Sequence, residues 1–161
     1  VRYPRGSEYS DPTCIDSSIA SKYYYFDHSA ASSRRVLVIT YGRLVFEAFE
    51  AEKILHDEGV PISILKLNQV HPIPADAVNI ALGYDDIFFF EEGIKNGSAA
   101  EQMLVSLNEK GYSGGFYIHA IDDCFVCQST VESAIKRLHL DGNSMAESIL
   151  SELQKGDSHI A

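Results

Sequence analysis

The sequence lacks several features that mark whole classes of proteins. Lysine and arginine contribute only 13 residues, against 23 aspartates and glutamates, and the formal net charge is -10. A nucleic-acid-binding protein needs a basic face, and this balance argues against one. The apolar runs, such as the one from Ile87 to Phe90, are too short to cross a bilayer. We therefore expect a protein that binds neither nucleic acid nor a membrane.

Cysteine is scarce as well, with 3 residues in the chain. A small, odd number of cysteines argues against a disulfide scaffold. No charged segment followed by an apolar one suggests a signal peptide, so we expect a reducing, cytoplasmic location. The chain begins with Val1 rather than methionine, which indicates a processed chain or a piece of a longer protein.

No complete catalytic or nucleotide-binding motif is present in the sequence. It contains no G-x-G-x-x-G and no Walker-type loop. It also contains no H-E-x-x-H, no nucleophile elbow and no Ser-His-Asp order. With 161 residues and 45% hydrophobic content, the chain is long enough to bury the core of one domain. The sequence thus predicts a globular domain without a full active site of its own.

Strand and helix patterns alternate along most of the chain. Continuous apolar runs typical of buried strands occupy residues 35–41, 61–68, 86–93 and 115–121. The aromatic segment 22–27 favours a further short edge strand. Apolar spacing predicts helices over 43–58, from Pro74 to about Leu82, from Ser98 to Gly111, and after capping boxes at Ser129–Glu132 and Ser144–Glu147.

This alternation predicts a three-layer α/β/α fold. We expect a mostly parallel sheet of about five strands, with helices on both faces and one antiparallel edge strand. We interpret residues 1–34 as a linker from a preceding domain, 35–155 as the α/β domain and 156–161 as a frayed tail.

Cys124 and Cys127 form a C-x-x-C pair, a pattern found in redox sites and, together with a residue such as His119, in zinc sites. Two observations weaken this interpretation. The preceding Asp122 and Asp123 would raise a thiol pKa rather than lower it, because nearby negative charge disfavours the thiolate. A closed structural zinc site also needs four ligands.

Three other polar residues follow strands, at the edge of the sheet where α/β proteins bind ligands. His71 follows the strand 61–68, and Glu91 and Glu92 end the strand 86–93. A pair of carboxylates suits acid–base chemistry. The alternatives are helix capping or an inter-domain contact for the glutamates and a structural role for His71.

Several stretches resemble the C-terminal domain of transketolase-type enzymes. They are "VRYPRG" at residues 1–6, "VLVITYGRLVFEAFEAEKIL", "ISILKLNQVHPIPADAV", "DIFFFEEG" and "FVCQSTVESAIKRLHLDGNSMAESI". The first and last most resemble the deoxyxylulose-phosphate synthases within that family. The middle of the chain would also suit transketolase itself or the pyruvate dehydrogenase β subunit.

The resemblance implies an enzyme of three α/β domains, the last of which is this one. In such enzymes the first two domains hold thiamine diphosphate and Mg²⁺, and the third packs against the second and across a homodimer. Residues 1–34 would then include the tail of a pyrimidine-binding-type domain. The reaction joins pyruvate, after decarboxylation, to glyceraldehyde 3-phosphate. Arg5 corresponds to a residue that binds the phosphate of this acceptor, and Arg2 is given no ligand role.

The Gly-Asp-Gly motif that binds diphosphate and Mg²⁺ in this family is absent from the chain. We therefore expect the chain alone to be inactive and to contribute no cofactor or metal ligand. Two alternatives stay open: a stand-alone assembly or regulatory module of the same fold, and a redox or zinc protein built on Cys124 and Cys127.

Overall fold

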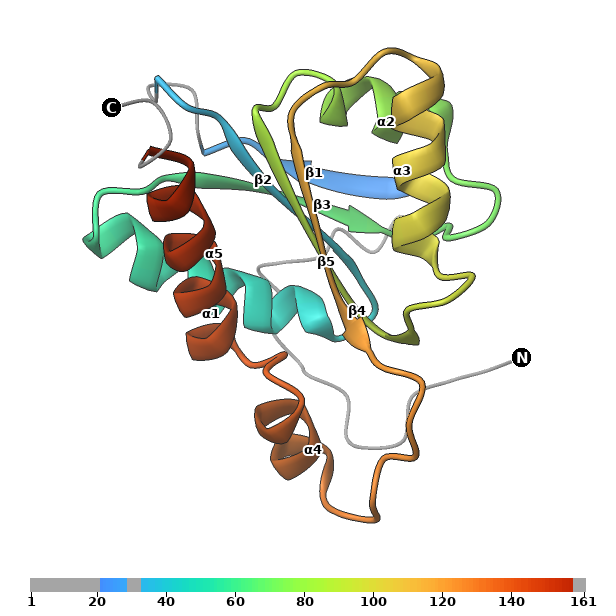
Figure 1. Ribbon diagram of the computed structural model, residues 1–161, viewed down its shortest axis with the longest axis vertical. Helices are drawn as coiled ribbons and strands as arrows, with labels where there is room; N and C mark the ends of the chain where they lie inside the picture. The colour runs from blue at the N-terminus through green and yellow to red at the C-terminus, as the bar shows by residue number, and fades with distance from the viewer. Residues whose placement is uncertain (1–20, 29–32, 158–161) are drawn as a thin grey trace.

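The computed structural model describes residues 21–28 and 33–157 (Figure 1). Its elements are β1 (Tyr23–Phe26), β2 (Val36–Tyr41), α1 (Leu44–Asp57), β3 (Ile62–Leu67), α2 (Ala75–Ala81), β4 (Asp86–Ile94), α3 (Ala99–Glu109), β5 (Gly115–Ile121), α4 (Val131–Arg137) and α5 (Gly142–Asp157). Each helix and strand expected from the sequence is present, within a few residues of its expected bounds.

The strands form one mixed sheet in the order β1-β3-β2-β4-β5. β2 pairs in parallel with β3 and β4, and β4 pairs in parallel with β5. β1 lies antiparallel to β3 at one edge, with Tyr23 opposite Leu67 and Phe26 opposite Ile64. The predicted fold class, including the antiparallel edge strand, is confirmed.

β1 belongs to the sheet although it lies within residues 1–34, which the sequence suggests are a linker. The chain before β1 is also tied to the sheet, because the N–H groups of Asn68 and Gln69 both donate to the carbonyl of Lys22, each at 2.9 Å. The "VRYPRG" stretch and the end of the expected tail lie outside the described residues. The division into three segments stays a prediction.

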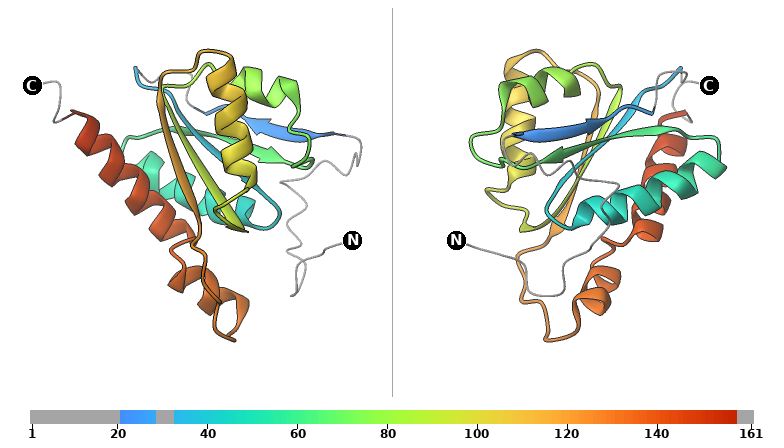
Figure 2. Two further views of the ribbon diagram at one scale, coloured as in Figure 1. Left: turned by 45° about the vertical axis from the view of Figure 1, so that its right-hand side comes forward. Right: turned by 180° about the vertical axis from the view of Figure 1, so that it is seen from behind.

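Helices cover both faces of the sheet (Figures 1 and 2). α1 and α5 lie side by side on one face, and α2 and α3 cover the other. β2 and the first part of β4 are buried on both faces, because they contain the continuous apolar runs Val36–Ile39 and Ile87–Phe90. Phe88 and Phe90 therefore enter the core beneath α1 and α5, while Phe89 enters the core beneath α2 and α3.

α3 begins and ends where the sequence predicts. The hydroxyl of Ser98 accepts a hydrogen bond from the N–H of Glu101 at 3.2 Å. The carboxylate of Glu101 reaches back to the N–H of Gly97, at 2.7 Å, instead of the N–H of Ser98. Gly111 follows the last turn with a φ of 80°, a conformation that glycine adopts without strain.

The capping boxes predicted at Ser129 and Ser144 are wrong. α4 is capped one residue later, by Thr130, whose hydroxyl accepts the N–H of Ser133 at 3.3 Å. α5 begins at Gly142, so that Ser144 lies inside the first turn of the helix.

The start of α5 is set by its contact with α1. The N–H of Gly142 donates to the carboxylate of Glu47 at 2.9 Å. A Cβ atom at this position would lie 2.7 Å from the Cβ of Glu50, so only glycine allows this approach. A local capping pattern contains no information about this contact between helices, which explains the misplaced box.

The packing of the core predicts that the same substitution destabilises the protein much more at a buried valine than at an exposed one. Val38 on β2 is fully buried, whereas Val105 on α3 is 57% exposed. Val38→Ala should lower the free energy of unfolding by about 2 kcal/mol, because it removes buried methyl groups and leaves a cavity. Val105→Ala should change it by less than about 0.5 kcal/mol. Urea denaturation of both variants measures the difference, and equal losses would contradict the assignment of the core.

Candidate functional site

Glu91 occupies the carboxyl edge of the sheet, where the sequence suggests acid–base chemistry. Its side chain is buried, with the residue 1% exposed. The hydroxyl of Tyr41 donates to Oε2 at 3.0 Å, and the N–H of Ala100 in the first turn of α3 donates to Oε1 at 3.2 Å. Glu91 therefore links β2, β4 and α3, and it takes the helix-capping role that was one of the alternatives.

Tyr41 is held as a neutral donor in this arrangement. Burial, and then the negative charge of Glu91, raise the pKa of the Tyr41 hydroxyl well above its usual value. The proton therefore stays on the tyrosine and is used in the hydrogen bond to Glu91. The pair makes a structural link, because neither group is left to exchange a proton with a substrate.

Glu92 is engaged as well, in an ion pair with Arg43 at the start of α1. The guanidinium donates to Oε1 through both Nε, at 2.8 Å, and Nη2, at 2.6 Å. Such two-point pairing fixes the orientation of both side chains. Hence the two carboxylates that the sequence places at this edge are each used by a neighbouring element, Glu91 by α3 and Glu92 by the start of α1.

His71 lies in the loop between β3 and α2 and is exposed. Its Nδ1 is 2.9 Å from Oε1 of Gln102 on α3. The contact joins the loop to a helix, which agrees with the structural alternative for this histidine.

Cys124 and Cys127 are exposed in the segment between β5 and α4, and both are free thiols. His119, the third candidate ligand, lies on β5 with its ring stacked on Phe90 at a centroid distance of 4.5 Å. Its Nε2 is buried and has no hydrogen-bond partner among the described residues, and burial lowers its pKa. Within residues 21–28 and 33–157, no group of three histidine, cysteine or acidic side chains is placed to hold a metal ion.

A groove of about 970 Å³ lies at the opposite, amino edge of the sheet. It is lined by Ser33, Arg34, Leu82, Tyr84, Asp85, Asp86, Lys110, Gly111, Tyr112, Ser113, Gly114 and Gly115. None of the sequence motifs identifies this groove. A usable signal is nevertheless present, because a pair of arginines precedes β2 and a pair of aspartates precedes or begins the adjacent parallel strand β4.

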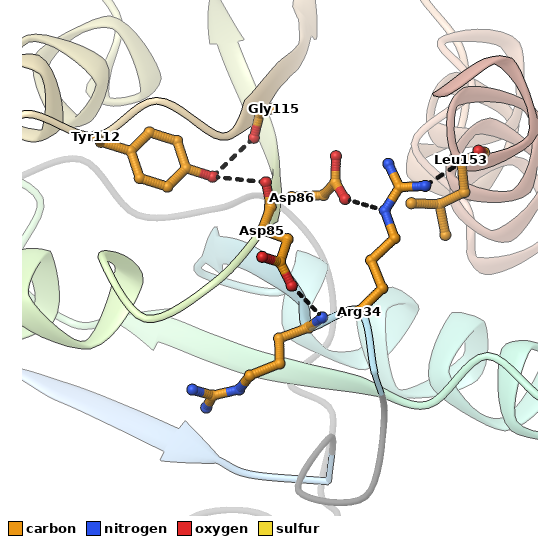
Figure 3. Close-up of polar contacts among 7 residues, drawn as sticks. Arg34, Asp85, Asp86, Tyr112, Gly115 and Leu153 are labelled. Carbon is orange, nitrogen blue, oxygen red and sulfur yellow. Dashed lines mark hydrogen bonds and ion pairs between the residues drawn. The ribbon is translucent and has the colours of Figure 1, made fainter. Parts of the chain in front are cut away.

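Two neighbouring arginines contact two aspartates at this edge (Figure 3). The guanidinium of Arg34 lies between the carboxylate of Asp86, at 2.5 Å from Nε, and the carbonyl of Leu153 on α5, at 3.2 Å from Nη1. The N–H of Arg35 donates to the carboxylate of Asp85 at 2.7 Å. The groove thus anchors the chain that enters β2 to both the sheet and the last helix.

Tyr112 closes the same groove from the loop before β5 (Figure 3). Its hydroxyl lies 3.0 Å from the carbonyl of Gly115 and 3.2 Å from that of Asp85. Burial, followed by the charges of the two neighbouring aspartates, raises the pKa of Tyr112, so the hydroxyl stays a donor. A Cβ atom on Gly115 would collide with the carboxylate of Asp86, so a larger residue here would have to displace that side chain.

These residues do not fit thiamine diphosphate and Mg²⁺, the groups that the family resemblance implies for the whole enzyme. The carboxylates at both edges of the sheet already accept hydrogen bonds or ion pairs from this chain. No cluster in the described part of the chain offers a metal three acidic or histidine ligands. We therefore derive no catalytic step through either group from these residues.

The contacts at both polar edges are made within this domain. Comparison with known proteins identifies its family. Residues 29–121, more than half of the chain, match the family described as "Transketolase, C-terminal domain". The chain belongs to this family, which confirms the resemblance seen in the sequence.

The curated proteins that the chain resembles include deoxyxylulose-phosphate synthases. The chain is 29% identical over 151 residues to 1-deoxy-D-xylulose-5-phosphate synthase of Clostridium botulinum (strain Eklund 17B / Type B). The matched region covers 93% of this chain and 24% of that protein. It is 25% identical over 157 residues to the Haemophilus influenzae (strain ATCC 51907 / DSM 11121 / KW20 / Rd) protein of the same name, covering 96% of this chain and 24% of that one. The chain therefore spans about a quarter of the length of these relatives.

Two solved transketolases share the fold. A structure described as "Split gene transketolase, inactive beta4 tetramer" superposes with a TM-score of 0.68 and 18% identity, over 76% of this chain and 40% of that one. Transketolase from Campylobacter jejuni subsp. jejuni NCTC 11168 superposes with a TM-score of 0.59 and 11% identity, over 81% of this chain and 18% of that one. Arg5 lies outside the described residues, so its role as a phosphate ligand stays a prediction.

The buried position of Glu91 leads to a prediction about stability. Glu91→Ala should lower the free energy of unfolding by about 2 to 3 kcal/mol, because it leaves the buried N–H of Ala100 and the partly buried hydroxyl of Tyr41 without this acceptor. Glu91→Gln keeps one acceptor oxygen and should cost less. Glu132, whose side chain is 81% exposed, provides the matched control, and Glu132→Ala should change stability by less than about 0.5 kcal/mol. A loss for Glu91→Ala no greater than that of the control, in urea denaturation, would refute the linking role.

Proposed function

We propose that this chain is the C-terminal domain of a thiamine-diphosphate-dependent 1-deoxy-D-xylulose-5-phosphate synthase. Such an enzyme joins pyruvate to glyceraldehyde 3-phosphate, with loss of CO₂, in isoprenoid biosynthesis. The observation that carries the proposal is the match of 93% of this chain to 24% of the Clostridium botulinum synthase. Nearly full coverage of this chain together with a quarter of the relative is what we expect when one domain of a larger enzyme is compared with the whole enzyme.

The proposed role of the domain is to pack against the preceding domain of the same polypeptide and to support a homodimer. The contact before β1 supports this role. The carbonyl of Lys22 accepts hydrogen bonds from the N–H groups of Asn68 and Gln69, at the point where the chain enters the sheet. A segment that leads in from another domain would therefore be held in a fixed position relative to this one.

We propose that the preceding domains hold thiamine diphosphate and Mg²⁺, which would supply the carbanion chemistry of the reaction when bound. The chain alone would then be inactive. The engaged carboxylates Glu91, Glu92 and Asp86 support this view, because none of them is free to bind a cofactor. The split-gene transketolase, a protein of similar fold, is likewise described as inactive in its beta4 tetramer.

Arg5 is the one substrate contact that we propose for this chain. It stands in "VRYPRG", the stretch that most resembles the synthases. A guanidinium suits the role because it is planar, is always charged and meets two phosphate oxygens at once. Arg5 would bind the phosphate of glyceraldehyde 3-phosphate in a site completed by the preceding domain.

A second candidate function is a non-catalytic assembly or regulatory module of the same fold. At both polar edges, acidic side chains form hydrogen bonds within this chain, which suits such a module as well as it suits one domain of an enzyme. The C-terminal domain of a transketolase or of a pyruvate dehydrogenase β-type protein is a further alternative. The substrates used by the whole polypeptide distinguish these three possibilities.

The test uses the whole polypeptide that carries this chain, supplied with pyruvate, glyceraldehyde 3-phosphate, thiamine diphosphate and Mg²⁺. We expect 1-deoxyxylulose 5-phosphate and CO₂ to form. Arg5→Ala should raise the KM for glyceraldehyde 3-phosphate about tenfold or more, because hydrogen bonds to a charged group contribute about 1.5 to 3 kcal/mol. Decarboxylation of pyruvate should be largely unchanged.

Arg2→Ala is the matched control, since it removes an equal charge from the same motif and should leave the KM unchanged. An unaltered acceptor KM in Arg5→Ala would exclude the phosphate contact. Absence of the product with wild-type protein would instead favour the alternative functions.

A further inference from the structure

Residues 122–130 join β5 to α4 and extend beyond the sheet (Figures 1 and 2). Every residue of this segment is exposed, and none belongs to a helix or a strand. Cys124 and Cys127 lie within it as free thiols. Phe125, between them, is fully exposed and packs against nothing. Since no buried side chain fixes the segment, it can change conformation without disturbing the core.

The backbone is held at each cysteine but not between them. The N–H of Cys124 donates to the carbonyl of Asp122 at 2.6 Å. The guanidinium of Arg137 on α4 donates to the carbonyl of Cys127 at 3.1 Å. Within the described part of the chain, the backbone groups of the two intervening residues make no hydrogen bond. Those two residues can therefore turn without losing one.

We propose that Cys124 and Cys127 form a reversible disulfide by exchange with a small aliphatic disulfide. The thiolate of one cysteine attacks a sulfur of the small disulfide, which forms a mixed disulfide and expels one small thiol. The thiolate of the other cysteine then attacks the cysteine sulfur of the mixed disulfide and expels the second small thiol. The protein dithiol loses two electrons and two protons in this exchange, and the small disulfide gains them.

The stretch from Cys124 to Cys127 has the length that such a ring requires. A disulfide needs Cα atoms about 4.4 to 6.8 Å apart. A β-turn brings the Cα atoms of its first and fourth residues within about 7 Å. Phe125 and Val126 would then take the central positions, where a type I turn needs no positive φ and accepts most residues. A local turn is thus sufficient to close the ring.

The ligands available at this pair favour disulfide exchange over metal binding. A closed zinc site needs four ligands. His119 is not a third ligand, because its ring is stacked on Phe90 and its Nε2 is buried, whereas both thiols are exposed. Two exposed thiols are enough for a disulfide. This inference goes beyond the proposed function and does not rest on it, because the exchange needs neither the preceding domains nor the substrates.

The test incubates the 161-residue chain with an excess of oxidised glutathione, blocks the remaining thiols with iodoacetamide and determines the masses of the protein and its peptides. We expect a protein that has lost two hydrogens, with Cys124 linked to Cys127. Cys124→Ser and Cys127→Ser should each stop at the mixed disulfide, at an occupancy about tenfold or more above that of wild type. Cys14→Ser, the matched control, should give the linked product unchanged.

Proline substitutions test the turn itself. Proline suits the second residue of a type I turn but not the third, where it forces the preceding residue out of the required conformation. Phe125→Pro should therefore close the ring at least as fast as wild type, and Val126→Pro about threefold or more slowly. Both positions are exposed, and circular dichroism shows whether each variant is folded.

Four results would overturn the proposal: thiols that stay reduced, a wild type that retains glutathione as a stable mixed disulfide, a link to Cys14 in place of the expected one, or equal closure rates in the two folded proline variants. Each of them would leave the proposed enzymatic function untouched, because none of these measurements depends on activity.

Discussion

The burial of β4 on both faces is the constraint on which the rest of the structure depends. Phe88 and Phe90 fill the layer beneath α1 and α5, and Phe89 fills the layer beneath α2 and α3, each with no exposed surface. A parallel strand buried in this way requires helices on both faces of its sheet. Polar side chains of the strand then lie toward its ends, where Asp86 and Glu91 are the most deeply buried acidic residues in the described part of the chain.

The architecture could be predicted from the sequence because it follows from local patterns. The continuous apolar runs identify the buried strands, and the aromatic segment before them identifies β1. The contacts at the polar edges could not be predicted in the same way, since Arg34 and Asp86 are distant in sequence and meet only because β2 and β4 are neighbours. The start of α5 at Gly142 likewise depends on a contact with α1. For Glu91, the sequence indicates its place but leaves its role open between acid–base chemistry and capping.

The acidic residues at the polar edges are used by the domain's own contacts. Glu91 and Glu92 hold the start of α3 and α1 respectively, and Asp86 holds the entering chain. These three carboxylates are thereby committed to contacts within the fold.

The central claim is that these residues build a stable domain without a cofactor site. Isothermal titration calorimetry of the 161-residue chain with thiamine diphosphate and Mg²⁺ tests it most directly, with circular dichroism to show that the protein is folded. We expect a folded chain that gives no heat of binding. Saturable binding of thiamine diphosphate to the folded chain would contradict the claim and would mean that it carries a cofactor site of its own.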